Sequence, residues 1–222
     1  MTTPRREFLS WLGAGGVVAA SGVHPGIASR SLASPQPVSD KWDMSWCDRV
    51  NGNVKAVFDS PRVSEGAALF RAQVWRDEHQ EVYGTAPAQC SAVLVFRHEG
   101  IPLVMNDAFW ARFNIGKELK LKDEKGKKWT SVNPIATRTP GTPDKFAAYN
   151  LASFVGSGGI VLACNFAFGE MVNRFKDADK LSEDEARKRA LDHLVPGVIL
   201  QPSGVFAALR AQQAGCAYLL AS

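Results

Sequence analysis

Over residues 54–222, short apolar runs alternate with longer segments in which apolar and polar positions recur at helical spacing. A short apolar run bounded by turn residues is typical of a buried strand, and the longer mixed segments are typical of helices that cover a sheet. The pattern predicts five strands, at 54–59, 91–96, 160–164, 198–200 and 217–220. It predicts helices at 64–82, 108–113, 144–154, 165–175, 182–194 and 203–213.

Strands that alternate with helices imply right-handed crossovers and a parallel sheet covered on both faces. We therefore predict an α/β fold, a flavodoxin-like, doubly wound, mainly parallel five-stranded sheet. Residues 117–130 depart from the alternation because they are highly charged, and Lys125-Gly126 is a turn signal. They predict a charged β-hairpin insertion, interpreted as a solvated flap, with a basic binding patch as the alternative.

The N-terminus has the layout of an export signal. Arg5-Arg6 is followed by Phe8-Leu9, a short, weakly apolar segment at 11–23 and then small residues. That segment is too short and too glycine-rich to predict a membrane anchor. The arginine pair resembles the twin-arginine (Tat) signal.

The pattern therefore predicts that the Tat translocase recognises Arg5 and Arg6 and exports the protein to the periplasm. We predict a signal peptide over 1–33, a Ser/Pro/Ala-rich linker over 34–50 and one domain over 51–222.

Composition narrows the possible partners. Of the 222 residues, 45% are hydrophobic and 22% charged, which is typical of a globular protein. The formal net charge is +4, and removal of the signal peptide would leave about +2, which gives no reason to expect a nucleic-acid partner. The four cysteines are far apart without a CxxC pair, and the histidines are scattered. We predict neither a metal site nor a cofactor.

One cysteine is predicted at the functional edge of the sheet. In a parallel sheet of this kind, ligands bind at the carboxyl ends of the strands. Cys164 ends a predicted strand directly before a helix, where the free N–H groups and the helix dipole favour a thiolate. The alternative is a buried cysteine packed as a small apolar residue. Cys90 and Cys216 precede their strands and are expected at the opposite edge.

Further candidates follow other strands. Arg97 and His98 leave the second strand at the edge expected for Cys164, and His98 could act as base or charge partner to the thiol. Ser203 begins a helix after the fourth strand and could bind an anion. Asn106 and Asp107 begin another helix and are candidates for substrate binding. For His98, Asn106 and Ser203 the alternative is a local backbone hydrogen bond or helix cap.

Together these features resemble the DsrE/DsrF-like sulfur-relay family, in the version with a Tat signal, over roughly Val54–Ser222. The resemblance rests on 93–98, 105–108 with Trp110, 160–165 with Ala167, 196–198, 203–205 and 211–218. It implies a flavodoxin-like sheet, assembly into homo-oligomers, and a persulfide carried on a cysteine after a central strand, which by position is Cys164. It also implies a sulfur-donor or acceptor protein as partner.

Two hypotheses follow. In the first, the protein is a periplasmic sulfur carrier or thiol-transfer protein that uses Cys164 and His98. Arg97, Asn106, Asp107 and Ser203 then shape the substrate pocket. In the second, the same crevice is a non-catalytic binding module for a small ligand or a protein, and Cys164 is structural.

Overall fold

The computed structural model describes residues 40–123, 125–138 and 142–222. The predicted signal peptide, with Arg5 and Arg6, and residues 34–39 of the predicted linker lie outside the described residues. Among the described residues, no helix is long and apolar enough to cross a membrane.

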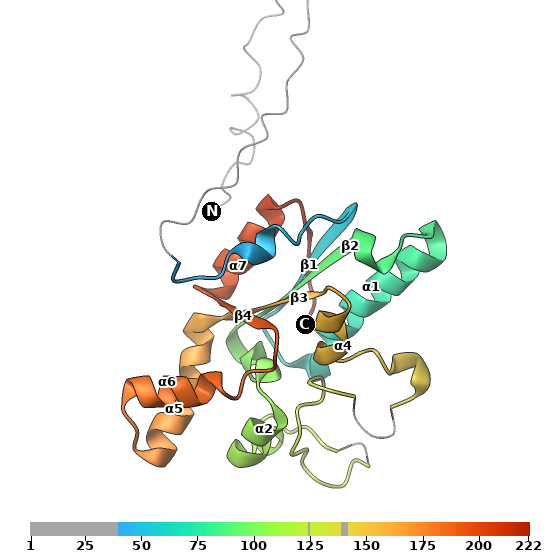
Figure 1. Cartoon of the computed structure of the whole chain (residues 1–222). Helices are drawn as coiled ribbons and strands as arrows, with labels where there is room; N and C mark the ends of the chain where they lie inside the picture. The colour runs from blue at the N-terminus through green and yellow to red at the C-terminus, as the bar shows by residue number, and fades with distance from the viewer. Residues whose placement is uncertain (1–39, 124, 139–141) are drawn as a thin grey trace, which may run out of the picture. The chain divides into compact units, whose positions relative to one another are not determined.

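Five parallel strands form one sheet in the order β4-β3-β2-β1-β5 (Figure 1). The strands are β1 (Val54–Ser60), β2 (Cys90–Phe96), β3 (Ile160–Cys164), β4 (Val198–Gln201) and β5 (Ala217–Leu220). Every neighbouring pair is parallel, so the predicted α/β, flavodoxin-like architecture is confirmed. All five strands lie within two residues of their predicted bounds.

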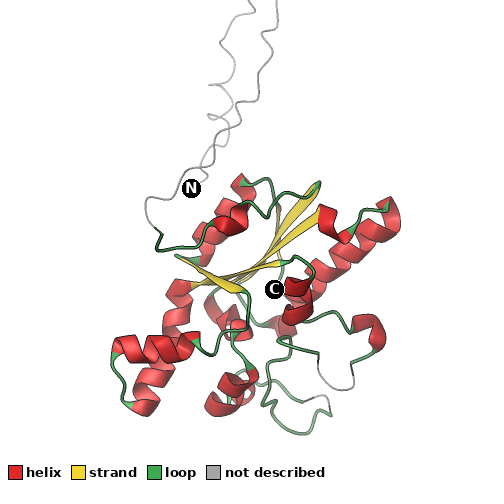
Figure 2. Ribbon diagram, in the orientation of Figure 1, coloured by secondary structure: helices red, strands yellow, loops and turns green. Residues whose placement is uncertain are grey.

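Helices lie on both sides of the sheet (Figure 2). They are α1 (Ala67–Tyr83), α2 (Asp107–Phe113), α3 (Ile115–Glu118), α4 (Leu151–Gly156), α5 (Asn165–Asp179), α6 (Glu183–Leu191) and α7 (Gly204–Gln213). The capping box that opens α6 is formed as its sequence indicates, because Ser182 and Glu185 each bond the other's backbone N–H.

Alternate residues of the strands pack into two separate cores, because successive side chains point to opposite faces of a sheet. Val57, Val93 and Leu162 pack with Ala207 and Ala211 of α7 on one face. The residues between them on the strands pack with α1, α4 and α5 on the other, larger face, and this set includes Phe58, Leu94, Ala163, Leu69, Phe154 and Phe168.

The two covered faces define a switch point between β3 and β4. The chain leaves β3 into α5 on the larger core face, whereas it leaves β4 into α7 on the opposite face. Where the connections of two adjacent parallel strands diverge in this way, a crevice opens at their carboxyl ends, and ligands of doubly wound sheets bind there.

Three segments differ from their predictions. The linker prediction extends too far, since a 3-10 helix at Ser45–Cys47 buries Trp46 completely in the smaller core. The predicted hairpin forms but starts later than predicted, because α3 takes up the beginning of the segment. Lys122 and Trp129 form its antiparallel bridge, and backbone hydrogen bonds join Thr130 to Leu121 and Asp123 to Lys128. The helix predicted over 144–154 divides, since Asn150 caps α4 and the N–H of Leu151 bonds to the Ile135 carbonyl.

Candidate functional site

A pocket of about 500 Å³ lies at the carboxyl ends of β2, β3 and β4, at the switch point. Three segments that are distant in the sequence converge on it: the loop after β2, the first turn of α5 and the first turn of α7. Its lining residues are Arg97, His98, Glu99, Cys164, Phe166, Ala167, Glu170, Ser203, Gly204 and Val205. The structure thus brings together four of the six residues predicted for the site.

Cys164 is the last residue of β3 and the N-cap of α5. Its sulfur accepts a hydrogen bond from the backbone N–H of Ala167 at 3.4 Å. The residue is 6% exposed, and it lines the pocket. Negative charge is stabilised at a helix N-terminus, so this position favours a sulfur that develops or carries charge.

His98 lines the same pocket in a left-handed backbone conformation. Its φ angle is +51°, and the side chain is exposed. Histidine visits this region more readily than most residues, but the conformation still costs energy, and such costs are concentrated at functional sites. His98 and Glu99 also line an adjoining hollow of about 350 Å³ with Arg62 and Ser222.

Ser203 caps α7 as the local sequence predicts. Its Oγ accepts a hydrogen bond from the N–H of Phe206 at 3.1 Å. In this bond the hydroxyl is only an acceptor, so its hydrogen is available to donate to a ligand. The N-termini of α5 and α7 therefore converge on one crevice from opposite faces of the sheet.

Arg97 lines the pocket with its alkyl chain, but its guanidinium is paired. Its Nε and Nη2 each donate to the Asp59 carboxylate at 2.9 Å, and the Tyr218 hydroxyl donates to the same carboxylate at 2.7 Å. Asp59 is 1% exposed. These hydrogen bonds raise the pKa of Arg97. This pairing fixes Arg97 as a wall of the pocket, and its direct binding of substrate stays a prediction.

Asn106 and Asp107 do not reach this pocket. Asn106 caps α2, because its Oδ1 accepts the N–H of Phe109 at 3.0 Å. The Oδ1 of Asp107 accepts the N–H of Asn133 at 2.8 Å, which ties the loop before α4 to the start of α2. The structure therefore does not bring these two residues to this pocket. Each accepts a hydrogen bond from a backbone N–H, and substrate binding by them stays a prediction.

Six lining residues were not predicted as site residues from the sequence: Glu99, Phe166, Ala167, Glu170, Gly204 and Val205. Phe166 and Glu170 are four residues apart on α5, so they share the helix face that carries them to the pocket. Their positions shortly after Cys164 could therefore have predicted that they lie near it. Phe166 is 87% exposed, which is unusual for an aromatic side chain.

The other three cysteines lie in different surroundings, and all four are free thiols. Cys90 and Cys216 stand at the amino ends of β2 and β5, opposite the pocket. Burial raises the pKa of the Cys90 thiol and raises that of Cys216 to about 11. Burial also raises the pKa of Cys47, although Arg210 opposes the shift.

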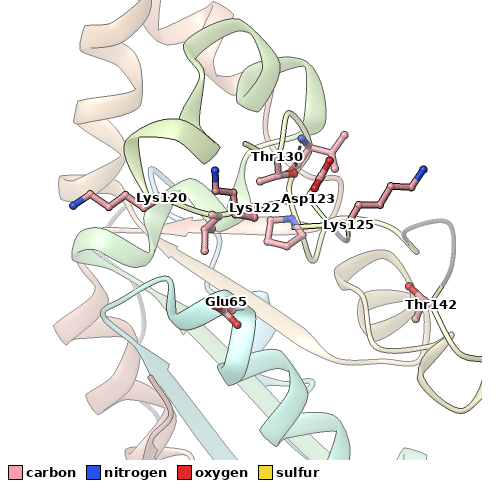
Figure 3. Close-up of a pocket in the computed structure, with 10 residues that line it drawn as sticks. Glu65, Lys120, Lys122, Asp123, Lys125, Thr130 and Thr142 are labelled. Carbon is pink, nitrogen blue, oxygen red and sulfur yellow. Dashed lines mark hydrogen bonds between the residues drawn. The ribbon is translucent and has the colours of Figure 1, made fainter. Parts of the chain in front are cut away.

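A larger hollow of about 750 Å³ lies between Glu65 and the charged segment after α3 (Figure 3). Figure 3 shows the ammonium groups of Lys120, Lys122 and Lys125 pointing away from one another. Lys122 stacks on the ring of Trp129, with its Nζ 3.3 Å from the ring centroid. Since its cations do not converge on a common point, we assign the candidate site to the smaller pocket.

Within the described residues, no three His, Cys, Asp or Glu side chains gather to hold a metal ion. No family model, curated protein or solved structure matches the chain.

Proposed function

We propose that the protein is an exported, DsrE-like sulfur carrier that accepts sulfane sulfur on Cys164 and passes it to an acceptor thiol. One observation carries the proposal: Cys164, His98 and two helix N-termini meet in a single pocket at the switch point of the sheet. A nucleophilic thiol needs a base and a position that stabilises negative charge, and in this proposal His98 and the N-terminus of α5 supply them.

The proposed loading step needs no external oxidant. His98 accepts the thiol proton of Cys164, and the thiolate attacks the sulfane sulfur of a donor such as thiosulfate. A new S–S bond forms at Sγ while the S–S bond of thiosulfate breaks, and its electron pair leaves with sulfite. In the transfer step, an acceptor thiolate attacks the outer sulfur of the persulfide, and Cys164 leaves as a thiolate.

The surroundings support charge on the sulfur. The Ala167 N–H already donates to Sγ, and the helix dipole of α5 acts in the same direction. Ser203 and the N-terminus of α7 line the same pocket, and in this proposal they stabilise the departing sulfite or the persulfide anion.

The test is intact mass spectrometry after incubation with thiosulfate. We expect a gain of about 32 Da, the mass of one sulfur atom, which dithiothreitol removes. Cys164→Ser should abolish the gain, whereas the matched variant Cys90→Ser should keep it. His98→Asn should slow loading by about tenfold or more, and Asn suits this variant because it tolerates the left-handed backbone. A gain that survives in Cys164→Ser would refute the proposal.

A second candidate, a non-catalytic binding module, is favoured by one observation. Cys164 is only 6% exposed, and Phe166, Ala167 and Val205 give the pocket apolar walls. A buried thiol among apolar neighbours packs as a small hydrophobic group. For such a module, the mass of the wild-type protein should stay unchanged with thiosulfate and with polysulfide.

A further inference from the structure

An exposed apolar surface runs from α7 onto the edge strand β5. We call it the β5–α7 surface, and its residues are Val205, Phe206, Leu209, Tyr218, Leu219 and Leu220, which are 40–60% exposed. It includes both faces of the edge strand, since Leu219 projects to the face opposite Tyr218 and Leu220. A shallow hollow of about 230 Å³ joins the two elements, since Val205, Leu209 and Tyr218 all line it. Exposed apolar patches of this kind mark interaction sites.

β5 lacks the features that usually protect an edge strand. Among the described residues it pairs with β1 alone, so within that part of the chain its other edge presents unpaired backbone groups. Its four residues, Ala-Tyr-Leu-Leu, include no charge and no proline, the usual guards against pairing with another chain. The opposite edge strand differs: β4 is half-buried along most of its length, and Gln201 is buried.

From this surface we infer that the protein forms a two-fold homodimer in which the β5 strands of two copies pair antiparallel. An edge strand with unpaired backbone groups can pair with another strand. In pairing about a two-fold axis, each copy uses the same residues to hydrogen-bond the free backbone groups of the other. The two sheets then become one continuous sheet of ten strands.

The area of the surface agrees with a second copy as its occupant. Whole side chains of this size offer roughly 150–220 Å² each, so the exposed fractions leave about 550 Å² of apolar surface. A standard interface buries about 800 Å² per partner, of which about 65% is apolar in homodimers. The β5–α7 surface alone therefore supplies the apolar part of such an interface. The two charged residues that line its hollow, Asp59 and Arg97, pair with each other and so do not call for a charged partner.

The inferred dimer interface is connected to the candidate site through Tyr218. This residue is 44% exposed in the single chain, and its hydroxyl donates to Asp59, which holds Arg97 against the pocket. Covering Tyr218 with a second copy fixes this network in place. The inference does not depend on sulfur chemistry, because it rests on surface and strand geometry alone.

Sedimentation and light scattering of the mature protein at about 1–100 µM test the inference. We expect twice the mass of one chain. Leu220→Lys and Leu209→Lys should each weaken the dimer by at least about tenfold. Val82→Lys is the matched control, because Val82 is 66% exposed on α1, outside the β5–α7 surface, and this variant should remain dimeric.

Hydrogen exchange provides a readout within the folded protein. The backbone amides of 218 and 220, which point away from β1, should exchange slowly at high protein concentration and faster on dilution. A wild-type monomer over the whole concentration range would overturn the inference. A dimer that persists unchanged in both lysine variants would also overturn it, because the copies would then meet through another surface.

Discussion

At the scale of single residues, four identical thiols differ because their surroundings differ. Cys90 and Cys216 are buried at the amino ends of strands, where neutral thiols are favoured. Cys164 stands at the carboxyl end of β3, where its sulfur meets a backbone N–H and a pocket. Position at one or the other end of a parallel strand thus separates a candidate nucleophile from packing residues.

We predict that iodoacetamide at pH 6.5 modifies Cys164 before Cys90, Cys216 or Cys47. A raised pKa keeps a thiol protonated up to higher pH, so Cys216 should become reactive only as the pH approaches about 11. Peptide mass spectrometry over time gives the order of labelling. Fastest labelling at Cys47 would contradict the prediction and favour a structural role for Cys164.

At the scale of elements, the walls of the pocket depend on how closely α7 approaches the loop after β2. A Cβ added at Gly204 would lie 2.5 Å from the Cβ of Arg97 and 2.6 Å from its Cδ. The absence of a side chain at this first position of α7 therefore allows the Arg97 chain to run past the helix to Asp59. Gly169, inside α5, has no atom within 4 Å of the corresponding position.

The two glycines form a matched pair for mutation. Gly204→Ala should destabilise the protein by about 1–3 kcal/mol, because the crowded Arg97 must shift away from Asp59. Gly169→Ala should stabilise it by about 0.5–1 kcal/mol, because alanine has the higher helix propensity and meets open space. Urea unfolding of both variants gives the two free energies of unfolding. Equal effects of the two substitutions would show that α7 can move aside freely.

At the scale of the whole molecule, the export prediction concerns residues 1–33, which precede the part of the chain that the structure describes. Arg5→Lys with Arg6→Lys should trap the precursor in the cytoplasm, because the translocase reads guanidinium groups that lysine cannot replace. Arg30→Lys, in the same predicted signal peptide, is the control and should leave export unchanged. Immunoblots of cell fractions measure both, and mature protein in the periplasm of the double variant would rule out the Tat route.

Most of the fold could be predicted from local pattern. The apolar runs predict all five strands because a strand buried on both faces requires continuous apolar residues. Cap residues such as Asn106 and Ser182 predict helix starts, because their side chains bond the free N–H groups. Local pattern did not predict the division of the helix at 144–154, because the hydrogen bond from Leu151 to Ile135 joins segments that are distant in the chain.

The sequence by itself determined which residues end the strands, and therefore that Cys164, His98 and Ser203 belong to one edge of the sheet. Only the tertiary structure decided what each of these side chains contacts. Arg97 and Asp107 carry charges that look available in the sequence, but Arg97 pairs with Asp59, and Asp107 bonds the backbone of Asn133. The physical reason is the distance along the chain over which each kind of interaction acts. Strand and helix patterns reflect neighbours in the sequence, whereas the hydrogen-bond partner of a side chain on another strand or loop depends on how the sheet assembles.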